Sequence, residues 1–376
     1  MAQTDSSLAH SKQIYIAVIG TGGVGSRFLL QLEYLFKQMC KRPSSPKLSL
    51  LLVARSSKIL YDQNYNGLPF EDITSRLENS DEAVLKLPEI VDYLTAAPSK
   101  SILVDNTSSQ EVADFYPRFL EKGISIVTPN KKGFSSSMKL WEDIFLAASK
   151  SGAHVFHESS VGAGLPIIST LKDLVETGDE IIKIEGVFSG TMSFLFNSFA
   201  PVNGSGGKWS TEVTNAKNFG FTEPDPRDDL NGLDVARKLT ILARLVGLPV
   251  KSPTSFPVQS LIPKELESVT DGNKFLQELP RFDAEMEQVK VAAENEGKVV
   301  RYVGSITVAT KEIKVGLQNF DRSNPIAMLK GSDNIISFYT KRYGNSPLIV
   351  QGAGAGGDVT AMGVSGDLIK VIKCLC

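Results

Sequence analysis

A glycine-rich turn near the start of the chain constrains the fold more than any other feature. An apolar run at residues 14–19 leads directly into Gly20-Thr21-Gly22-Gly23-Val24-Gly25, and a helical pattern follows from residue 26 to about residue 39. The first glycine permits a tight turn, the second lets the backbone approach a pyrophosphate, and the third lets helix and strand pack closely. The helix N-terminus supplies amide donors and a positive dipole end. This order predicts a dinucleotide site at residues 20–25; a glycine turn without a ligand is the alternative.

The end of the second predicted strand bears on the choice of nucleotide. Residues 48–53 form that strand, and Ala54, Arg55, Ser56 and Ser57 follow it. An NAD-selective enzyme carries an acid here for the ribose hydroxyls, whereas an arginine suits a 2′-phosphate. We therefore expect NADP to be accepted, with NAD as the second candidate. A solvated loop arginine is the alternative role for Arg55.

Strands and helices then alternate through the first half of the chain. Strands are predicted at residues 101–105, 125–128 and 155–158, with helical segments between them, as at residues 136–149. This alternation is typical of an α/β domain with an open parallel sheet, whose ligands lie beyond the carboxyl ends of the strands. Three candidate site residues occupy such positions: Thr107, Lys132 and Glu158.

The pattern changes after about residue 166. A helix at residues 166–175 precedes a strand at residues 181–188, and later segments are rich in strands. We expect a mixed α+β substrate-binding and dimerisation domain at residues 157–349. A second glycine-rich turn, residues 352–357, leads into a final helix. We expect that helix to return to the nucleotide domain, formed by residues 1–156 and 350–376, and to close over the cofactor; a simple packing role for the turn is the alternative.

An acidic stretch at residues 220–238 carries the other candidate residues. Four acids crowd a loop that contains two prolines: Glu223, Asp225, Asp228 and Asp229. A helix is predicted to begin near Asp228 or Asp229, because Asp is a good N-cap, and to end at Gly247. Asp234 and Lys238 lie four residues apart on one face of it. Its apolar face comprises Val235, Leu239, Leu242 and Val246. The alternative is a surface helix with one exposed ion pair, which contributes little stability.

Composition narrows the classes of function. The 376 residues suffice for two domains, and a net charge of −2 gives no basic footprint for nucleic acid. No apolar run reaches the length of a membrane span, and the polar residues 1–10 do not read as a secretory signal. Three cysteines, at positions 40, 374 and 376, fit no metal site and indicate reduced thiols in the cytoplasm. With three histidines, acid–base chemistry must depend on Lys, Asp and Glu.

Several stretches together resemble the homoserine dehydrogenases, particularly the short fungal type without a fused kinase or a C-terminal regulatory domain. The matching stretches are residues 17–25, 127–132, 157–166, 188–191, 220–226, 229–238 and 352–356. The resemblance implies reversible NAD(P)H-dependent reduction of L-aspartate 4-semialdehyde to L-homoserine, between aspartate and threonine or methionine. The first turn departs slightly, with Thr21 and Gly23 where alanine and valine are common, but the glycine spacing is kept.

The resemblance also implies roles for individual residues. Lys238 would be the catalytic acid/base, with Lys132 beside the substrate and the nicotinamide. The amino acid substrate would be surrounded by Glu223, Asp229, Asp234 and Thr191. Gly220 and Gly356 would touch the cofactor. A sodium ion would bind Glu158 and the carbonyl oxygens of Val161, Ala163 and Leu165; one carboxylate with backbone oxygens suits a hard monovalent cation better than zinc.

The chemistry of the residues supports the same reaction. Aldehyde reduction needs a hydride at carbon and a proton at oxygen, and a lysine ammonium can polarise the carbonyl and donate that proton. Burial or a second cation such as Lys132 would lower the pKa of Lys238, while Asp234 would oppose that shift and orient the ammonium.

Three rival functions remain open at this point. A dehydrogenase that uses a thiolate nucleophile needs a well-placed cysteine, which this chain lacks. Another Rossmann amino acid dehydrogenase and a non-enzymatic NADP-binding sensor are the other two, since fold alone does not determine function. As partners we expect a small amino acid substrate and a second copy of the chain in a homodimer, and neither nucleic acid nor membrane.

Overall fold

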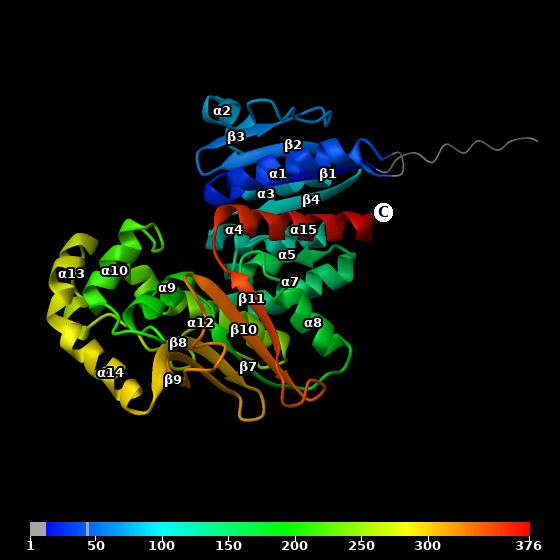
Figure 1. Ribbon diagram of the computed structural model, residues 1–376. Helices are drawn as coiled ribbons and strands as arrows, with labels where there is room; N and C mark the ends of the chain where they lie inside the picture. The colour runs from blue at the N-terminus through cyan, green and yellow to red at the C-terminus, as the bar shows by residue number, and fades with distance from the viewer. Residues whose placement is uncertain (1–12, 43–44) are drawn as a thin grey trace, which may run out of the picture. The chain divides into compact units, whose positions relative to one another are not determined.

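The chain divides into two compact units. The computed structural model describes residues 13–42 and 45–376, so the expectation for residues 1–10 lies outside the described part. Unit 1 comprises Met1–Asn130, Glu142–His157 and Thr360–Cys376, and unit 2 comprises Lys131–Trp141 and Glu158–Val359 (Figure 1). The division differs from the expected one in three places: residues 131–141 and residues 350–359 group with unit 2, and His157 groups with unit 1.

Unit 1 is built on a six-stranded sheet of order β3-β2-β1-β4-β5-β6. Its strands are β1 (Gln13–Ile19), β2 (Lys47–Arg55), β3 (Lys58–Tyr61), β4 (Lys100–Asp105), β5 (Ser125–Val127) and β6 (Val155–Phe156). Neighbouring strands are parallel except for β3, which pairs antiparallel with β2 at the edge. The predicted parallel sheet is confirmed.

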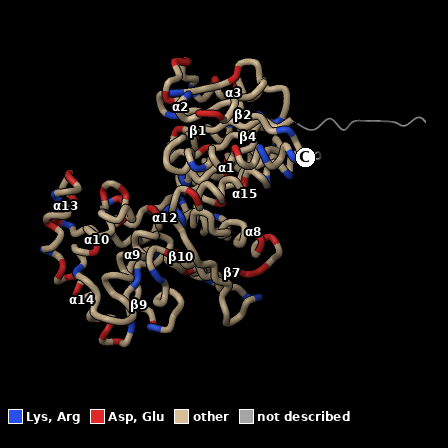
Figure 2. Tube along the Cα trace, turned by 45° about the horizontal axis from the view of Figure 1, so that its top comes forward, with Lys and Arg blue, Asp and Glu red and all other residues tan. Residues whose placement is uncertain are grey.

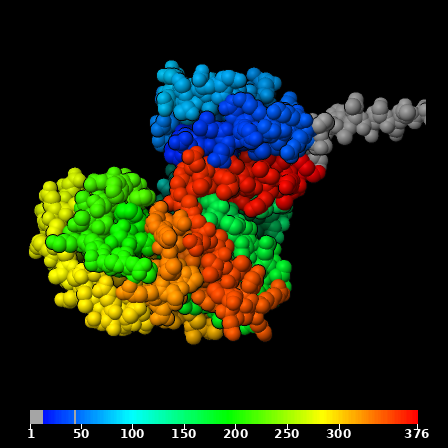
Figure 3. Space-filling model, viewed as in Figure 1, coloured from blue at the N-terminus to red at the C-terminus, as the bar shows by residue number. Residues whose placement is uncertain are grey.

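Helices cover the sheet of unit 1 because its strands are apolar on both faces, as is usual for parallel sheets. They are α1 (Gly23–Met39), α2 (Ile73–Glu78), α3 (Leu87–Thr95), α4 (Gln110–Asp114), α5 (Tyr116–Glu121), most of α7 (Met138–Ser151) and most of α15 (Gly357–Leu375). The core joins Phe28 and Leu32 of α1 to Val364 and Leu368 of α15 and to the strands. In Figure 3 the red surface of α15 lies along the blue surface of α1, and Ser365 Oγ donates a hydrogen bond of 3.0 Å to Gln31.

Unit 2 is built on a five-stranded antiparallel sheet of order β11-β10-β7-β8-β9. Its strands are β7 (Ile181–Val187), β8 (Lys298–Thr307), β9 (Glu312–Asp321), β10 (Asp333–Thr340) and β11 (Leu348–Ala353). Its helices are α6 (Lys132–Ser135), α8 (Ile168–Glu176), α9 (Gly190–Phe199), α10 (Trp209–Asn218), α11 (Arg227–Leu230), α12 (Leu233–Leu245), α13 (Gly272–Glu278) and α14 (Asp283–Asn295), with 3-10 turns at Glu158–Ser160, Lys264–Leu266 and Leu279–Phe282. The predicted mixed α+β second unit is confirmed.

The acidic stretch forms two helices where the sequence predicted one. The short α11 follows Pro226, so neither Asp228 nor Asp229 is the N-cap, and α12 begins after Gly232. Gly232 is left-handed, with φ of 74°, and a Cβ there would lie 2.1 Å from the Tyr302 hydroxyl oxygen. The chain must therefore turn at Gly232, and only glycine fits. Gly247, with φ of 83°, follows the end of α12 as predicted.

Acidic and basic residues are interspersed along the trace of both units (Figure 2). Among the described helices, none is long and apolar enough to cross a bilayer. Cys40, Cys374 and Cys376 are exposed and form no disulfide.

The close packing of the first turn gives a test of the fold. A Cβ on Gly25 would lie 1.9 Å from the backbone oxygen of Gly20, whereas one on Gly23 would meet open space. Gly25→Ala should destabilise the protein by about 1–3 kcal/mol, because a backbone clash outweighs the better helix propensity of alanine. Thermal denaturation without nucleotide measures this, with Gly23→Ala as the control. Equal melting temperatures for the two variants would contradict the packing argument.

Candidate active site

The Asp234–Lys238 pair lies on α12, whose apolar side chains Val235, Leu239 and Leu242 are buried. Lys238 Nζ lies 2.7 Å from Asp234 Oδ2 and donates a hydrogen bond of 2.6 Å to the Phe188 carbonyl oxygen. The Lys238 side chain is 9% exposed, and that of Asp234 is 41% exposed. Because the lysine is buried, this is not the exposed surface ion pair that the sequence left open.

A second lysine contacts the same carboxylate. Lys131 Nζ lies 3.4 Å from Asp234 Oδ1, so the acid lies between two ammonium groups. Sequence reasoning selected the neighbouring Lys132, which the structure places at the first position of α6. Lys131 was missed because two consecutive lysines look equivalent until the direction of that short helix is known.

The surroundings of the pair shift the pKa of both groups. Burial lowers the pKa of Lys238, and the positive charge of Lys131 adds to the effect, while Asp234 and Asp229 oppose it. Burial by itself would raise the pKa of Asp234, but the charges of Lys131 and Lys238 outweigh burial and hold that pKa below its usual range. The buried ammonium therefore loses its proton more readily than an ordinary lysine.

The acids of the preceding loop divide into two groups. The Thr191 hydroxyl oxygen lies 2.6 Å from the Phe221 carbonyl oxygen and 2.8 Å from Asp229 Oδ1, and the Glu223 amide donates to Asp229 Oδ2 at 2.8 Å. Burial raises the pKa of Asp229, and the nearby acids Glu223 and Asp234 add to it. Asp225 is different, because it forms an ion pair with Arg227.

Thr191, Asp229 and Glu223 are thus brought together within unit 2. The Glu223 side chain is exposed. The carboxylates of Asp229 and Glu223 and the Thr191 hydroxyl group suit the ammonium group of an amino acid.

The glycine turn of unit 1 has the features that a dinucleotide requires. Gly20 has φ of 93°, and a Cβ on it would lie 2.8 Å from Thr107 Cγ2. Gly22 and Gly23 face open space, so a pyrophosphate can approach the backbone there. The N-terminus of α1 has no side-chain cap, which leaves its amides for an anion. The residues therefore fit the nucleotide.

A buried network supports the loop after β4. Asp105 Oδ1 accepts from the Thr107 amide at 2.8 Å, and Asp105 Oδ2 accepts from the Tyr116 hydroxyl at 2.5 Å and from Asn130 at 3.0 Å. Burial raises the pKa of both Asp105 and Tyr116. Sequence reasoning named only Thr107 here; an acid that ends an apolar strand was the available signal for Asp105.

The remaining nucleotide candidates lie at chain turns. Arg55 ends β2, is 48% exposed at its side chain, and its Nη1 lies 3.9 Å from Glu78 Oε1. Gly220, with φ of 74°, follows α10, and Gly356, with φ of 118°, precedes α15. Both glycines are exposed.

The loop that begins at Glu158 is tightly organised. Glu158 Oε1 accepts from the Ile168 amide at 2.7 Å and Oε2 accepts from the Ser169 amide at 3.0 Å, at the start of α8. Ala163 is left-handed, with φ of 54°, and the Leu165 carbonyl oxygen accepts from the Ile167 amide at 2.9 Å. Within the described residues, no three His, Cys, Asp or Glu side chains gather as metal ligands, so a cation at Glu158 would need backbone oxygens.

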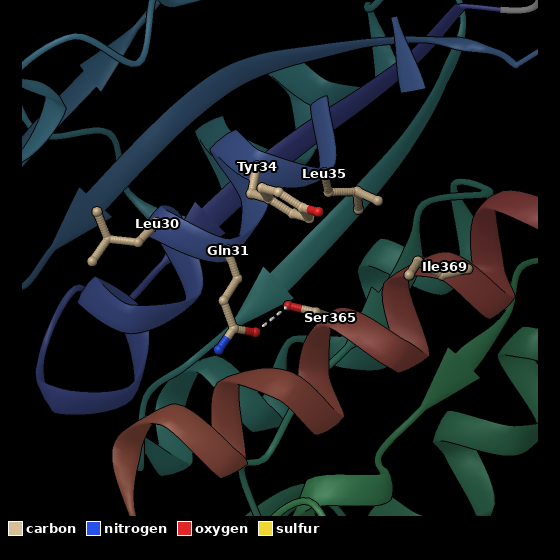
Figure 4. A pocket seen from close by; sticks show the side chains of 6 residues that line it. All are labelled: Leu30, Gln31, Tyr34, Leu35, Ser365 and Ile369. Atoms are coloured by element: carbon tan, nitrogen blue, oxygen red, sulfur yellow. Dashed lines mark hydrogen bonds between the residues drawn. The ribbon is translucent and has the colours of Figure 1, made fainter. Parts of the chain in front are cut away.

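A separate hollow lies on the outer side of α1 and α15. It is lined by Leu30, Gln31, Tyr34, Leu35, Ser365 and Ile369 (Figure 4). No residue of the candidate site is among them, so the hollow plays no part in the chemistry described here.

Comparison with known proteins accounts for both units. A family described as "Homoserine dehydrogenase, NAD binding domain" matches residues 20–158, and one described as "Homoserine dehydrogenase" matches residues 166–369. The chain belongs to the homoserine dehydrogenase family. It is an NAD(P)-dependent oxidoreductase that acts on a CH–OH group, and its reaction interconverts L-aspartate 4-semialdehyde and L-homoserine.

Individual relatives extend over nearly the whole chain. It is 59% identical to homoserine dehydrogenase of Emericella nidulans over 97% of its length and 100% of the relative, and 49% identical to that of Saccharomyces cerevisiae over 97% and 99%. The crystal structure of a Candida auris protein of unknown function has a TM-score of 0.89 and 46% identity, over 96% of this chain and 99% of that one. A hyperthermophilic archaeal homoserine dehydrogenase in complex with NADPH has a TM-score of 0.70 and 23% identity, over 96% of this chain and 97% of that one. This likeness shows the shared fold.

Proposed function

We propose that Lys238 is the proton donor when this homoserine dehydrogenase reduces aspartate 4-semialdehyde, and the proton acceptor in the reverse direction. One observation supports this most: a buried ammonium lies between Asp234 and the Phe188 carbonyl oxygen, and its pKa is lowered. The nucleotide, when bound, would supply the hydride that the carbonyl carbon needs. Lys238 hydrogen-bonds the carbonyl oxygen, stabilises the charge that develops there, and transfers its proton to give the alcohol and a neutral amine.

The neighbouring side chains take supporting roles in this proposal. Asp234 fixes the direction of the Lys238 ammonium, and Lys131 keeps that ammonium acidic. Asp229, Thr191 and Glu223 hold the amino group of the substrate. Lys132 stays a candidate for contact with substrate and nicotinamide.

Removal of the lysine tests its role. Lys238→Ala should lower kcat about 100-fold or more, in line with the loss of general acid–base catalysis, while nucleotide binding is retained. Steady-state kinetics with aspartate semialdehyde and fluorescence titration with NADPH measure the two quantities. Near-normal turnover would refute the assignment.

A matched lysine serves as the control. Lys290 is also buried, at 6% exposure, and pairs with Glu287 at 2.7 Å. Lys290→Ala should leave kcat unchanged within about twofold even if it lowers stability, because the loss of a structural ion pair does not alter proton transfer.

The pH dependence follows from the direction of the pKa shift. Reduction needs protonated Lys238, so its kcat should fall as pH rises through a pKa below the ordinary lysine value, and homoserine oxidation should rise through the same pKa. Lys131→Gln removes a positive charge near the ammonium, so the protonated form becomes more favourable and the pKa should rise. The falling limb of the reduction profile should then move to higher pH. A limb that stays in place, or moves down, would exclude Lys131 from this role.

For the nucleotide, we propose that NADP is accepted through Arg55, with NAD as an alternative cofactor. Arg55 at the end of β2 supports this. Arg55→Ala should raise KM for NADPH about 10- to 100-fold, because a charged hydrogen bond contributes about 1.5–3 kcal/mol, and should hardly change KM for NADH. Glu78→Gln, which removes the nearby acid, is the comparison variant and should lower KM for NADPH. Equal changes for both nucleotides would argue against the assignment.

We further propose that Glu158 and the carbonyl oxygens of Val161, Ala163 and Leu165 hold a monovalent cation such as Na⁺. The acid beside a left-handed turn supports this set, since oxygen ligands suit hard cations. The melting temperature should be higher in NaCl than in choline chloride at equal ionic strength, and Glu158→Gln should remove the difference. Equal melting temperatures of the wild type in both salts would count against the site.

Assembly and location complete the proposal. We propose a homodimer, supported by the exposed apolar side chains Ile182 and Ile349 on strands β7 and β11 of the second sheet. Sedimentation equilibrium tests this, and a monomer mass at micromolar concentration would contradict it. Three cysteines that form no disulfide support a cytoplasmic location, which cell fractionation tests.

A further inference from the structure

Arg244 is a buried cation on α12, about one and two-thirds turns beyond Lys238. The residue is 5% exposed, and its guanidinium donates to backbone carbonyl oxygens of two separate segments. Nη1 donates to Phe134 at 2.7 Å and Nη2 to Ser136 at 2.7 Å. Nε donates to Val250 at 3.0 Å, and Nη2 also reaches Val250 and Lys251 at 2.9 and 3.1 Å. The guanidinium carbon lies 5.8 Å from the centre of the Trp141 ring.

The first of these segments is the one that carries Lys131. The Lys131 carbonyl oxygen accepts from the Phe134 amide at 3.0 Å and the Ser135 amide at 2.9 Å, and the Lys132 carbonyl oxygen accepts from the Ser136 amide at 3.2 Å. Residues 131–136 are therefore one hydrogen-bonded turn. Arg244 holds the far end of that turn against α12.

We propose that Arg244 is a positioning residue that fixes the turn at residues 131–136 to α12 and so places the Lys131 ammonium at Asp234. This inference rests on the proposed role of Lys238.

The Lys131 side chain cannot fix this geometry by itself. Its contact with Asp234 is 3.4 Å long and both side chains are partly exposed, at 31% and 41%, and such pairs contribute little. The bonds from Arg244 to Phe134 and Val250 are buried, and their loss would leave carbonyl oxygens without these donors inside the protein. Arginine also suits the task better than lysine, because its planar fork reaches several acceptors at once.

If the turn at residues 131–136 were no longer held by Arg244, the charges around Lys238 would change. The groups that face the Lys238 ammonium are Asp234 on the same helix, Asp229 on α11 and Lys131 before α6. If Lys131 withdraws, two acids remain without the opposing cation. The proton on Lys238 is then held more tightly, and its transfer to substrate becomes slower at the same pH.

Arg244→Lys keeps the charge and removes the fork. In this variant kcat for reduction should fall about tenfold, as expected when a catalytic group is misplaced, and KM for NADPH should stay within about twofold. The falling limb of the pH profile should move to higher pH, as in Lys131→Gln. An unshifted limb would overturn the proposal.

Arg301 provides the matched control. It is 2% exposed and donates to the carbonyl oxygens of Ala200 and Ala327, both at 2.7 Å, in a part of unit 2 that holds none of the charges near Lys238. Arg301→Lys should lower the melting temperature as Arg244→Lys does, yet leave the pH limb in place. A shifted limb in the control would show that any buried arginine has this effect, and would also overturn the proposal.

A double variant separates the inference from the function on which it rests. In a Lys131→Gln background, Arg244→Lys should add no further shift, because the two changes act through the same ammonium. If Lys131→Gln moves the limb and Arg244→Lys does not, the positioning role fails and the role of Lys238 stands. If Lys238→Ala retains turnover, the proposed function itself fails.

A milder variant covers the case in which Arg244→Lys does not fold. Trp141→Leu removes the ring over the guanidinium and keeps every hydrogen bond donor of Arg244. It should move the limb in the same direction by a smaller amount, and an unchanged profile in this folded variant would overturn the proposal.

Discussion

The burial of one ammonium group sets the requirements for the rest of unit 2. A lysine that loses contact with water must gain hydrogen bonds and an opposite charge, and Lys238 obtains them from Phe188 and Asp234. In the proposed mechanism, full compensation would hold the proton of Lys238 too firmly for catalysis. The carboxylate of Asp234 is shared with Lys131, which weakens its hold on that proton. Stability and acidity are thus balanced at one carboxylate.

The position of these charges depends on a backbone turn at which any side chain would clash, and unit 1 has a second such turn. Gly232 lies between α11 and α12, against the Tyr302 hydroxyl. It fixes where α12 begins, and so where Asp234 and Lys238 lie. In unit 1, Gly25 contacts the carbonyl of Gly20 and leaves Gly22 and Gly23 open to a phosphate. In both places the absence of a side chain positions a polar group that lies a few residues away.

Sequence reasoning located the parallel sheet, the glycine turn and the Asp234–Lys238 pair, because each has a local signature in spacing or residue type. It joined α11 to α12, since the hydroxyl that crowds Gly232 belongs to Tyr302, far along the chain. It selected Lys132 and not Lys131. Neighbouring side chains in a turn point in different directions, and the sequence does not show that Lys131 is the one that reaches Asp234. Arg244 was not identified, because its partners are carbonyl oxygens, which every residue carries.

The return of α15 to the first unit has a consequence for synthesis of the protein. The core around β1 and α1 includes Val364, Leu368, Val371 and Ile372, among the last residues of the chain. The ribosome has therefore made all of unit 2 before unit 1 can close its core. Until then the apolar faces of β1 and β2 lack part of their cover, which exposes the nascent chain to aggregation and to chaperones. The nucleotide unit begins before unit 2 along the chain, and its core is complete only after unit 2 has been made.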